Sequence, residues 1–407
     1  MIAALQQLAA RLDAEWRAAG YKPRLFPALA ARSLAELGPQ RGDPLAEIAG
    51  WVSGTRDFPA ACNPFGPLGH PAFTVWSNGR FYVNLYAYLT PEVVVHDHNF
   101  AGAFVNLAGR TVHCTYAFAH GERVDPSVRV GDVALDDVEM IKEGMVRRIE
   151  PGTALIHQVW HVSRPTIVLI IRTPALSGRA ARQFQYLRPA IATEVFRDPT
   201  LSRSSPERFQ YTSKVAECLR GTPGAVPYVS SLVEREHPWH AVWHLVDHWQ
   251  LLETSGTLGE TIERAAQRHG AWFRAMERAG RKLVLFHSIN WRAVAAEQDR
   301  IVMAMLLTLD SWSRIAPALR MLLPGVAPHD AVLATLRRLS DERAIPLALR
   351  EEPLALLRCE MQSEGNEHAW KRVMRETFDL SGRKSWSAAR MLQRDLREHE
   401  LLRPLFV

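Results

Sequence analysis

Cysteine is scarce in this sequence, and long apolar runs are missing from it. The 407 residues contain four widely spaced cysteines without a CxxC pair, so neither a disulfide framework nor a thiolate zinc site is expected. This usage fits a reducing cytoplasm. No continuous apolar stretch reaches the roughly 18 residues that a membrane-spanning helix needs, and charged residues interrupt the N-terminus, so we predict neither a membrane span nor a signal peptide. The cysteines are Cys62, Cys114, Cys218 and Cys359.

Concentrated charge and several familiar catalytic motifs are also absent. The net charge of +6 is spread along the chain without a block of like charges, so a nucleic-acid partner is not expected. Glycine-rich phosphate loops, nucleophile elbows and paired catalytic carboxylates are not found. What remains is a globular composition, 47% apolar and 23% charged, with enough apolar material for sizeable cores.

Three stretches of different periodicity predict an α+β protein. Residues 1–65 have helical spacing of apolar residues and are expected to form a helical lead-in packed on the next segment. Residues 66–195 contain short β-rich runs separated by turn residues, which predicts a barrel. Residues 205–407 return to helical periodicity and predict an all-α domain of unknown role, joined by a Pro- and Ser-rich linker at 197–206. The clearest predicted strands are 80–89, 93–98, 111–118, 146–149 and 166–171.

A cluster of histidines in the β-rich segment predicts a metal site. His96 and His98 lie in one predicted strand and share a face, while Asp97 points the opposite way. A later motif supplies His157 as a third imidazole. Neutral imidazoles suit iron, zinc, copper or nickel and leave coordination positions open. His161 is the rival third ligand, because four residues of straight strand separate it from His157 by roughly 13 Å and one ion cannot reach both without a bend.

A polar face on the strand at 80–89 predicts the substrate side of this site. Tyr82, Asn84, Tyr86 and Tyr88 recur at period two, and their phenols and amide can orient a small polar ligand, while the intervening apolar residues pack outward. Arg172 could supply a guanidinium fork for a substrate carboxylate. We therefore predict Tyr86, Tyr88 and Arg172 as substrate-binding residues.

The segment from about 73 to 175 resembles a cupin and, within that superfamily, the cysteine dioxygenase (thiol dioxygenase) group. The resemblance implies a double-stranded β-helix and iron(II) held by His96, His98 and His157. It further implies a small thiol- or amino-acid-like substrate oxidised by O2 and, by analogy, a homodimer. The matching motifs are Asn78-Gly79-Arg80-Phe81, His96-Asp97-His98 with Leu107-Ala108-Gly109, and Ile156-His157-Gln158-Val159.

The sequence departs from this group at several positions. Gly102 and Ala103 stand where many cupins carry a glutamate ligand, which favours a three-histidine site and excludes a cysteine–tyrosine cross-link at Ala103. The group's Ser-His-Tyr relay falls on Val168, Ile170 and Arg172, and its carboxylate-clamping arginine has no counterpart. Cysteine itself is therefore not the expected substrate.

Two other functions fit the same residues. A non-redox cupin would use zinc, nickel or manganese as a Lewis acid in isomerisation, elimination or hydrolysis. A non-catalytic ligand-sensing or scaffold protein would bind a protein partner or nucleic acid through its helical half without turnover.

The helical half contains a second group of possible ligands on one helix face. Such a stripe can hold a second metal, but it is more often a packed Trp/His face at a domain interface. The residues are His240, His244, Asp247 and His248. Two further histidines, His113 and His120, are interpreted as structural or exposed.

Overall fold

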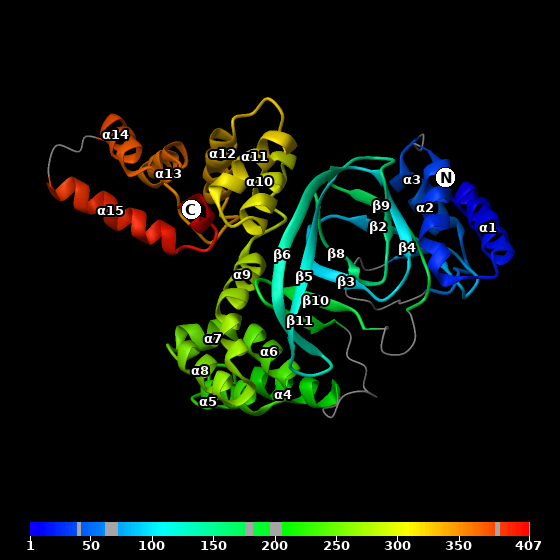
Figure 1. Cartoon of the computed structure of the whole chain (residues 1–407), viewed down its shortest axis with the longest axis horizontal. Coiled ribbons are helices and arrows are strands. Elements are labelled where there is room, and N and C mark those ends of the chain that lie inside the picture. Colours follow the sequence, from blue (N-terminus) through cyan, green and yellow to red (C-terminus); the bar gives the residue numbers. More distant parts are fainter. Residues whose placement is uncertain (39–41, 62–71, 176–181, 196–205, 379–382, 407) are drawn as a thin grey trace. The chain divides into compact units, whose positions relative to one another are not determined.

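The computed structural model describes residues 1–38, 42–61, 72–175, 182–195, 206–378 and 383–406. Its contacts divide the chain into two compact units, Met1–Gly280 and Arg281–Val407 (Figure 1). The linker expected at 197–206 lies outside the described residues except for Pro206, so the expected domain boundary there stays a prediction.

The N-terminal helices form an apolar layer against the β structure. In α1 (Ile2–Ala18) the apolar residues recur every three or four positions, which places them on one buried face. Asp43 caps α3 (Pro44–Gly54) by accepting a hydrogen bond from the backbone N–H of Leu45. Between these helices lie a short 3₁₀ turn, η1 (Pro23–Leu25), and α2 (Phe26–Leu37).

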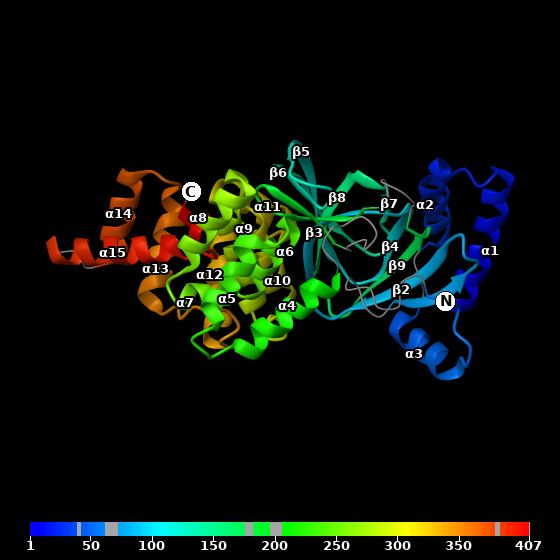
Figure 2. The same ribbon diagram turned by 90° about the horizontal axis from the view of Figure 1, so that it is seen from below.

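The first sheet has five antiparallel strands in the order β1-β2-β9-β4-β7. The helices α1 to α3 lie on its outer side (Figure 2). The strands are β1 (Phe73–Ser77), β2 (Tyr82–Tyr88), β4 (Gly102–Ala108), β7 (Val146–Ile149) and β9 (Thr166–Arg172).

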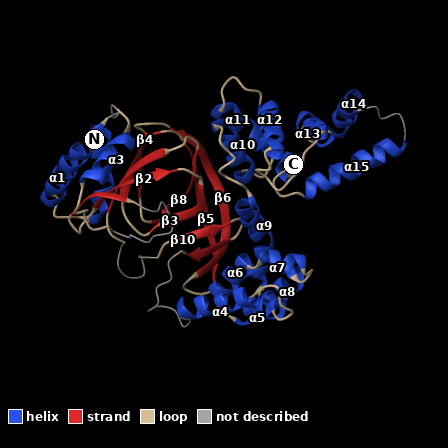
Figure 3. Ribbon diagram, turned by 180° about the vertical axis from the view of Figure 1, so that it is seen from behind, coloured by secondary structure: helices blue, strands red, loops and turns tan. Residues whose placement is uncertain are grey.

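The remaining strands close into a barrel in the order β10-β11-β6-β5-β8-β3, also antiparallel (Figure 3). A pairing between Gln185 and His96 joins the last strand to the first. The strands are β3 (Glu92–His98), β5 (Thr111–Arg123), β6 (Val128–Ile141), β8 (Gly152–His161), β10 (Phe184–Leu187) and β11 (Ile191–Glu194).

Strand alternation gives the first sheet two different faces. Phe81, Val83 and Leu85 are fully buried in the core shared with the N-terminal helices. The intervening side chains of β2 line a cavity on the inner face. The apolar residues of β2 therefore pack outward, as the sequence predicts, and the polar residues between them face inward.

Helices follow the barrel within the first unit. Trp239 Nε1 donates a hydrogen bond to the Glu194 carbonyl at the end of β11, and His237 lies 3.2 Å from Asp125 in the β5–β6 turn. Helix α6 is thereby tied directly to the barrel. The helices are α4 (Pro206–Leu219), α5 (Ala225–Arg235), α6 (Pro238–Asp247), α7 (Trp249–Thr254) and α8 (Leu258–His269), followed by the 3₁₀ turn η3 (Ala271–Ala275).

The second unit is helical. Its buried Asp299 accepts hydrogen bonds from Thr335 and Arg338, which links two of its helices. The unit division falls within α9 (Met276–Ser288), after which come α10 (Glu297–Thr308), α11 (Trp312–Leu322), α12 (Pro328–Asp341), α13 (Glu351–Ser363), α14 (Glu367–Thr377), α15 (Arg383–Glu398) and the 3₁₀ turn η4 (Arg403–Phe406).

The expected fold class is confirmed: N-terminal helices precede a β-barrel, and an all-helical region follows. The long strand β6 was not among the clearest predicted strands, because its acidic residues and Gly131 have low β propensity. Within the described residues, no helix combines the length and apolarity needed to cross a membrane.

Candidate metal centre

Neighbouring strands β3 and β8 bring three histidines together. His96 pairs with His157 across the ladder, and His98 follows two residues after His96. The ring centroids are 4.8 to 4.9 Å apart, and one nitrogen from each ring lies within 4.8 Å of the others. The structure thus joins His157, rather than His161, to the pair in the HDH motif.

The three imidazoles are in an environment that keeps them neutral. Burial is the first cause that lowers the pKa of His96, and it lowers the pKa of His98 and His157 well below the ordinary value. Charge repulsion from other histidines, His113 among them, also lowers the pKa of each of the three rings. Neutral imidazole is the form that binds a metal ion.

One hydrogen bond identifies which nitrogen of His96 is available. His96 Nδ1 lies 2.8 Å from the carbonyl oxygen of Val94. A carbonyl can only accept, so Nδ1 carries the proton and Nε2 keeps its lone pair. This leaves Nε2 as the ligand atom of His96.

The structure adds three residues that the sequence did not predict as part of the site. His113 Nε2 is 2.8 Å from His157 Nδ1, and His113 Nδ1 is 3.1 Å from a Glu139 carboxylate oxygen. Arg147 binds both oxygens of Glu139. The sequence indicates a structural or exposed role for His113. In the structure its side chain is 2% exposed and contacts His157, a proposed ligand, directly. The side chain of His120 lies outside the described residues.

A cavity of about 510 Å³ opens beside the three histidines. Its walls come from the inner face of the first sheet and from β3 and β8 of the barrel. The buried Thr74 Oγ1 and Asn84 Oδ1 on these walls have no hydrogen-bond partner within the described residues. Buried polar atoms normally have partners, so these two atoms indicate a polar ligand.

The residues predicted to bind substrate all line this cavity. The rings of Tyr86 and Tyr88 are nearly parallel, with centroids 6.0 Å apart. The guanidinium of Arg172 lies 3.6 Å from the centroid of Phe100, and its charge contributes to lowering the pKa of His98. Within the described residues, no carboxylate pairs with Arg172, so the structure places an uncompensated cation beside the histidines.

Backbone packing explains why position 102 does not supply a carboxylate as a fourth ligand. A Cβ atom on Gly102 would lie 2.0 Å from the carbonyl oxygen of Ile171 on the adjacent strand. Any side chain there would force β4 away from β9. Ala103 points to the outer core, and Phe104 packs near the rings of His157 and His113.

Asp97, between the two histidines of the motif, has a separate role. It accepts hydrogen bonds from the backbone N–H of Phe184 at 2.6 Å and from the hydroxyl of Tyr186 at 2.9 Å. Burial raises the pKa of Asp97 to about 6 in spite of these bonds. Asp97 thus holds β3 against β10, and the opposite strand face carries the two imidazoles.

His161 lines the same cavity at some distance from the cluster. Its ring stacks on Tyr88 with centroids 3.7 Å apart, and its Nδ1 is 3.4 Å from the hydroxyl of Thr111. The alternating strand faces that the sequence predicts bring it into the cavity, but four residues of strand separate it from His157.

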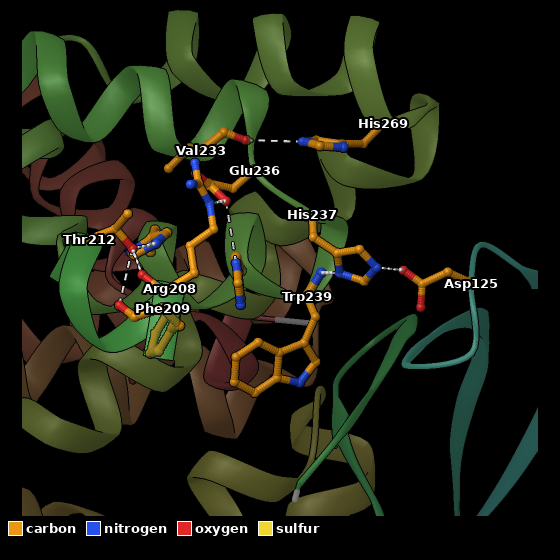
Figure 4. Close-up of polar contacts among 11 residues, drawn as sticks. Asp125, Arg208, Phe209, Thr212, Val233, Glu236, His237, Trp239 and His269 are labelled. Carbon is orange, nitrogen blue, oxygen red and sulfur yellow. Dashed lines mark hydrogen bonds and ion pairs between the residues drawn. The ribbon is translucent and has the colours of Figure 1, made fainter. Parts of the chain in front are cut away.

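The histidine stripe of α6 is a packed face. Figure 4 shows residues that surround it, among them Phe209, Thr212 and Glu236. The rings of His240 and His244 pack on Phe209, His240 Nδ1 is 3.4 Å from Glu236, and His244 Nε2 is 3.0 Å from the hydroxyl of Thr212. Within the described residues, the single group of three His, Cys, Asp or Glu side chains close enough to share an ion is His96, His98 and His157. The structure therefore gives no support to a second metal site formed with Asp247 or His248.

No protein-family model matches the chain, and a search of curated proteins gave no significant match. A closed antiparallel barrel carrying three clustered histidines is compatible with a cupin-like jelly roll, and membership of the cysteine dioxygenase group stays a prediction.

Proposed function

We propose that this protein is a mononuclear non-haem iron(II) oxygenase of the thiol-dioxygenase kind, oxidising a small thiol- or amino-acid-like substrate with O2. The observation that carries the proposal is the group of three neutral imidazoles at the wall of a cavity that is also lined by Arg172, an arginine with no carboxylate partner in the described part of the chain. The combination supports a site that binds a cation and an anionic ligand side by side.

The donor set fits such an ion. His96, His98 and His157 provide three neutral nitrogen ligands without a carboxylate among them. An iron(II) ion held there would supply open coordination positions for substrate and dioxygen.

The chain's own residues would bind and orient the substrate. Arg172 would pair with a carboxylate through its planar guanidinium. The Asn84 amide and the Thr74 hydroxyl, both buried on adjacent strands and paired in register, offer hydrogen bonds to a second polar group. Tyr86 and Tyr88 would donate their phenolic hydroxyls.

Apolar residues limit water in the same space. Phe104, Val168 and Ile170 come from β4 and β9 and face the cavity between the polar residues. A cavity with apolar walls and few polar groups orients a ligand strongly, because each polar contact is made in a low dielectric.

Metal content is the first test. We expect the purified chain to contain about one iron per chain, and the His96→Ala variant to lose most of it, because one of three ligands is gone. The matched control is His329→Ala, a partly exposed histidine on α12 of the second unit. Equal metal content in the wild type and the His96→Ala variant would contradict the site.

Oxygen uptake is the second test. After anaerobic reconstitution with iron(II), we expect O2 consumption with at least one compound of a panel of thiols and amino acids. Iron-loaded protein that consumes no O2 with any of them would remove the oxygenase assignment. Purification with zinc, nickel or manganese as the bound metal would favour the non-redox alternative.

A further inference from the structure

We propose that His113, Glu139 and Arg147 form a positioning relay that determines which ring nitrogen of the neutral His157 carries the proton. The relay keeps this proton on Nδ1, so that His157 presents an unprotonated Nε2 to the metal. This inference rests on the proposed metal centre. The relay residues touch neither substrate nor metal; they act through His157.

The relay is continuous from the buried His157 to the partly exposed side chains of Glu139 and Arg147. His157 on β8 contacts His113 on β5 at 2.8 Å. His113 stands opposite Glu139 of β6 in the register and contacts its carboxylate at 3.1 Å. Arg147 on β7 of the first sheet binds the same carboxylate through Nε at 2.8 Å and through a terminal amino group.

The Arg147–Glu139 pair determines which nitrogen of each histidine in the relay carries a proton. Hydrogen bonds from Arg147 are the main cause that lowers the pKa of Glu139 to about 2, so its carboxylate accepts. His113 Nδ1 must then donate to Glu139. In a neutral ring, His113 Nε2 accepts, and it can accept only from a proton on His157 Nδ1. That proton leaves Nε2 of His157 with a lone pair directed to the other histidines.

The same logic shows what breaks the relay. In a Glu139→Leu variant, His113 Nδ1 has no carboxylate to donate to, so nothing holds the proton of His113 on that nitrogen. His113 Nε2 can then donate as well as accept, and part of the His157 rings carry their proton on Nε2. A ligand nitrogen that carries a proton cannot bind a metal ion.

A purely structural role is the competing explanation, because Arg147 and Glu139 also tie the two sheets together. Two substitutions at His113 separate the two roles. Gln at this position can still donate to Glu139 and accept from His157, whereas Leu can do neither. The charge control is Asp137→Asn, which removes an exposed carboxylate two residues from Glu139 on β6.

The experiment uses the full chain freed of metal. Long-range proton–nitrogen NMR on the histidine rings reports which nitrogen of His157 carries the proton, without any metal present. Titration with cobalt(II), followed by its visible absorption, then gives the affinity of the wild type and of each variant. Thermal unfolding of each metal-free variant reports whether the barrel is intact.

We expect the Nδ1–H form of His157 in the wild type and a mixture of the Nδ1–H and Nε2–H forms in Glu139→Leu. Cobalt(II) should bind about 10- to 100-fold more weakly to Glu139→Leu and His113→Leu, the range found when outer-shell partners of ligands are removed. His113→Gln and Asp137→Asn should stay within about threefold of the wild type.

Two results would overturn the relay. The first is an Nε2–H form of His157 in the wild type. The second is equal cobalt(II) affinity in His113→Leu and His113→Gln. A wild type with the Nδ1–H form that takes up no cobalt(II) or iron(II) would instead overturn the proposed metal centre itself.

Discussion

His113 and His157 are both buried histidines on neighbouring barrel strands, and their surroundings assign them different roles. His157 faces two other imidazoles, while His113 lies between His157 and a carboxylate. Alternation along one strand cannot distinguish these cases, because both rings are buried. The signal in the sequence was a glutamate in the following strand, and only the β5–β6 register identifies it as Glu139.

At the residue scale, His244 should make the first unit sensitive to acid. Burial, followed by repulsion from His240 and His248, lowers the pKa of His244 to about 3, whereas Glu236 opposes the shift. Phe209 and Thr212 of α4 pack against the His244 ring. Below about pH 6.5, His244 therefore binds a proton in the unfolded chain but not in the folded chain. The free energy of unfolding decreases for this reason as the pH falls from about 6.5 toward 3.

The His244→Gln variant tests this dependence, because Gln does not titrate and can still hydrogen bond to Thr212. Each group of this kind contributes up to about 1.4 kcal/mol per pH unit. Between pH 7 and pH 4.5, we expect the free energy of unfolding of the variant, measured with a denaturant, to decrease by about 1–3 kcal/mol less than that of the wild type. Parallel pH profiles for the two proteins would show that His244 is not the titrating group.

At the element scale, the closeness of β4 and β9 depends on one glycine. A Cβ atom at Gly102 would meet backbone atoms of Ile171 and Arg172, which cannot rotate away. We expect Gly102→Ala to destabilise the first unit by about 1–3 kcal/mol or more, and to reduce metal binding because Arg172 and Phe104 shift. Chemical denaturation and cobalt(II) titration measure both effects.

Gly50 provides the matched control for this substitution. It lies in helix α3 with nothing within 4 Å of an added Cβ. Alanine there should leave metal binding unchanged and stabilise the helix by about 0.5–1 kcal/mol. If Gly102→Ala were as stable as Gly50→Ala, β4 and β9 would not be packed as closely as the structure shows.

At the scale of the whole molecule, the site belongs to one compact unit. The histidine cluster, the relay and the cavity all lie within Met1–Gly280. We expect a fragment of residues 1–280 to bind cobalt(II) with the stoichiometry and affinity of the full chain, measured by absorption titration. A folded fragment that fails to bind the metal would show that the second unit completes the site.

A shorter fragment, residues 1–205, tests the domain boundary that the sequence predicts. It lacks α6, which contacts the barrel through Trp239 at Glu194 and through His237 at Asp125. We expect it to unfold at a lower temperature than the 1–280 fragment, because these contacts are internal to the first unit. Equal unfolding temperatures would instead make α4 to α8 a separate domain.

The sequence alone determined the class of each segment and the core of the site. Period-two alternation places His96 and His98 on one face and turns the tyrosines of β2 away from the apolar core, because strand geometry is local. The helical periodicity of α1 identifies its buried face for the same reason.

Tertiary structure decided everything that depends on which strands are neighbours. The pairing of His96 with His157 excludes His161 from the cluster, and the β5–β6 register places Glu139 behind His113. The stripe on α6 became a packed face because Phe209 and Thr212 cover it from another helix. Contacts between residues distant in the sequence arise from packing of the whole fold, which local periodicity does not contain.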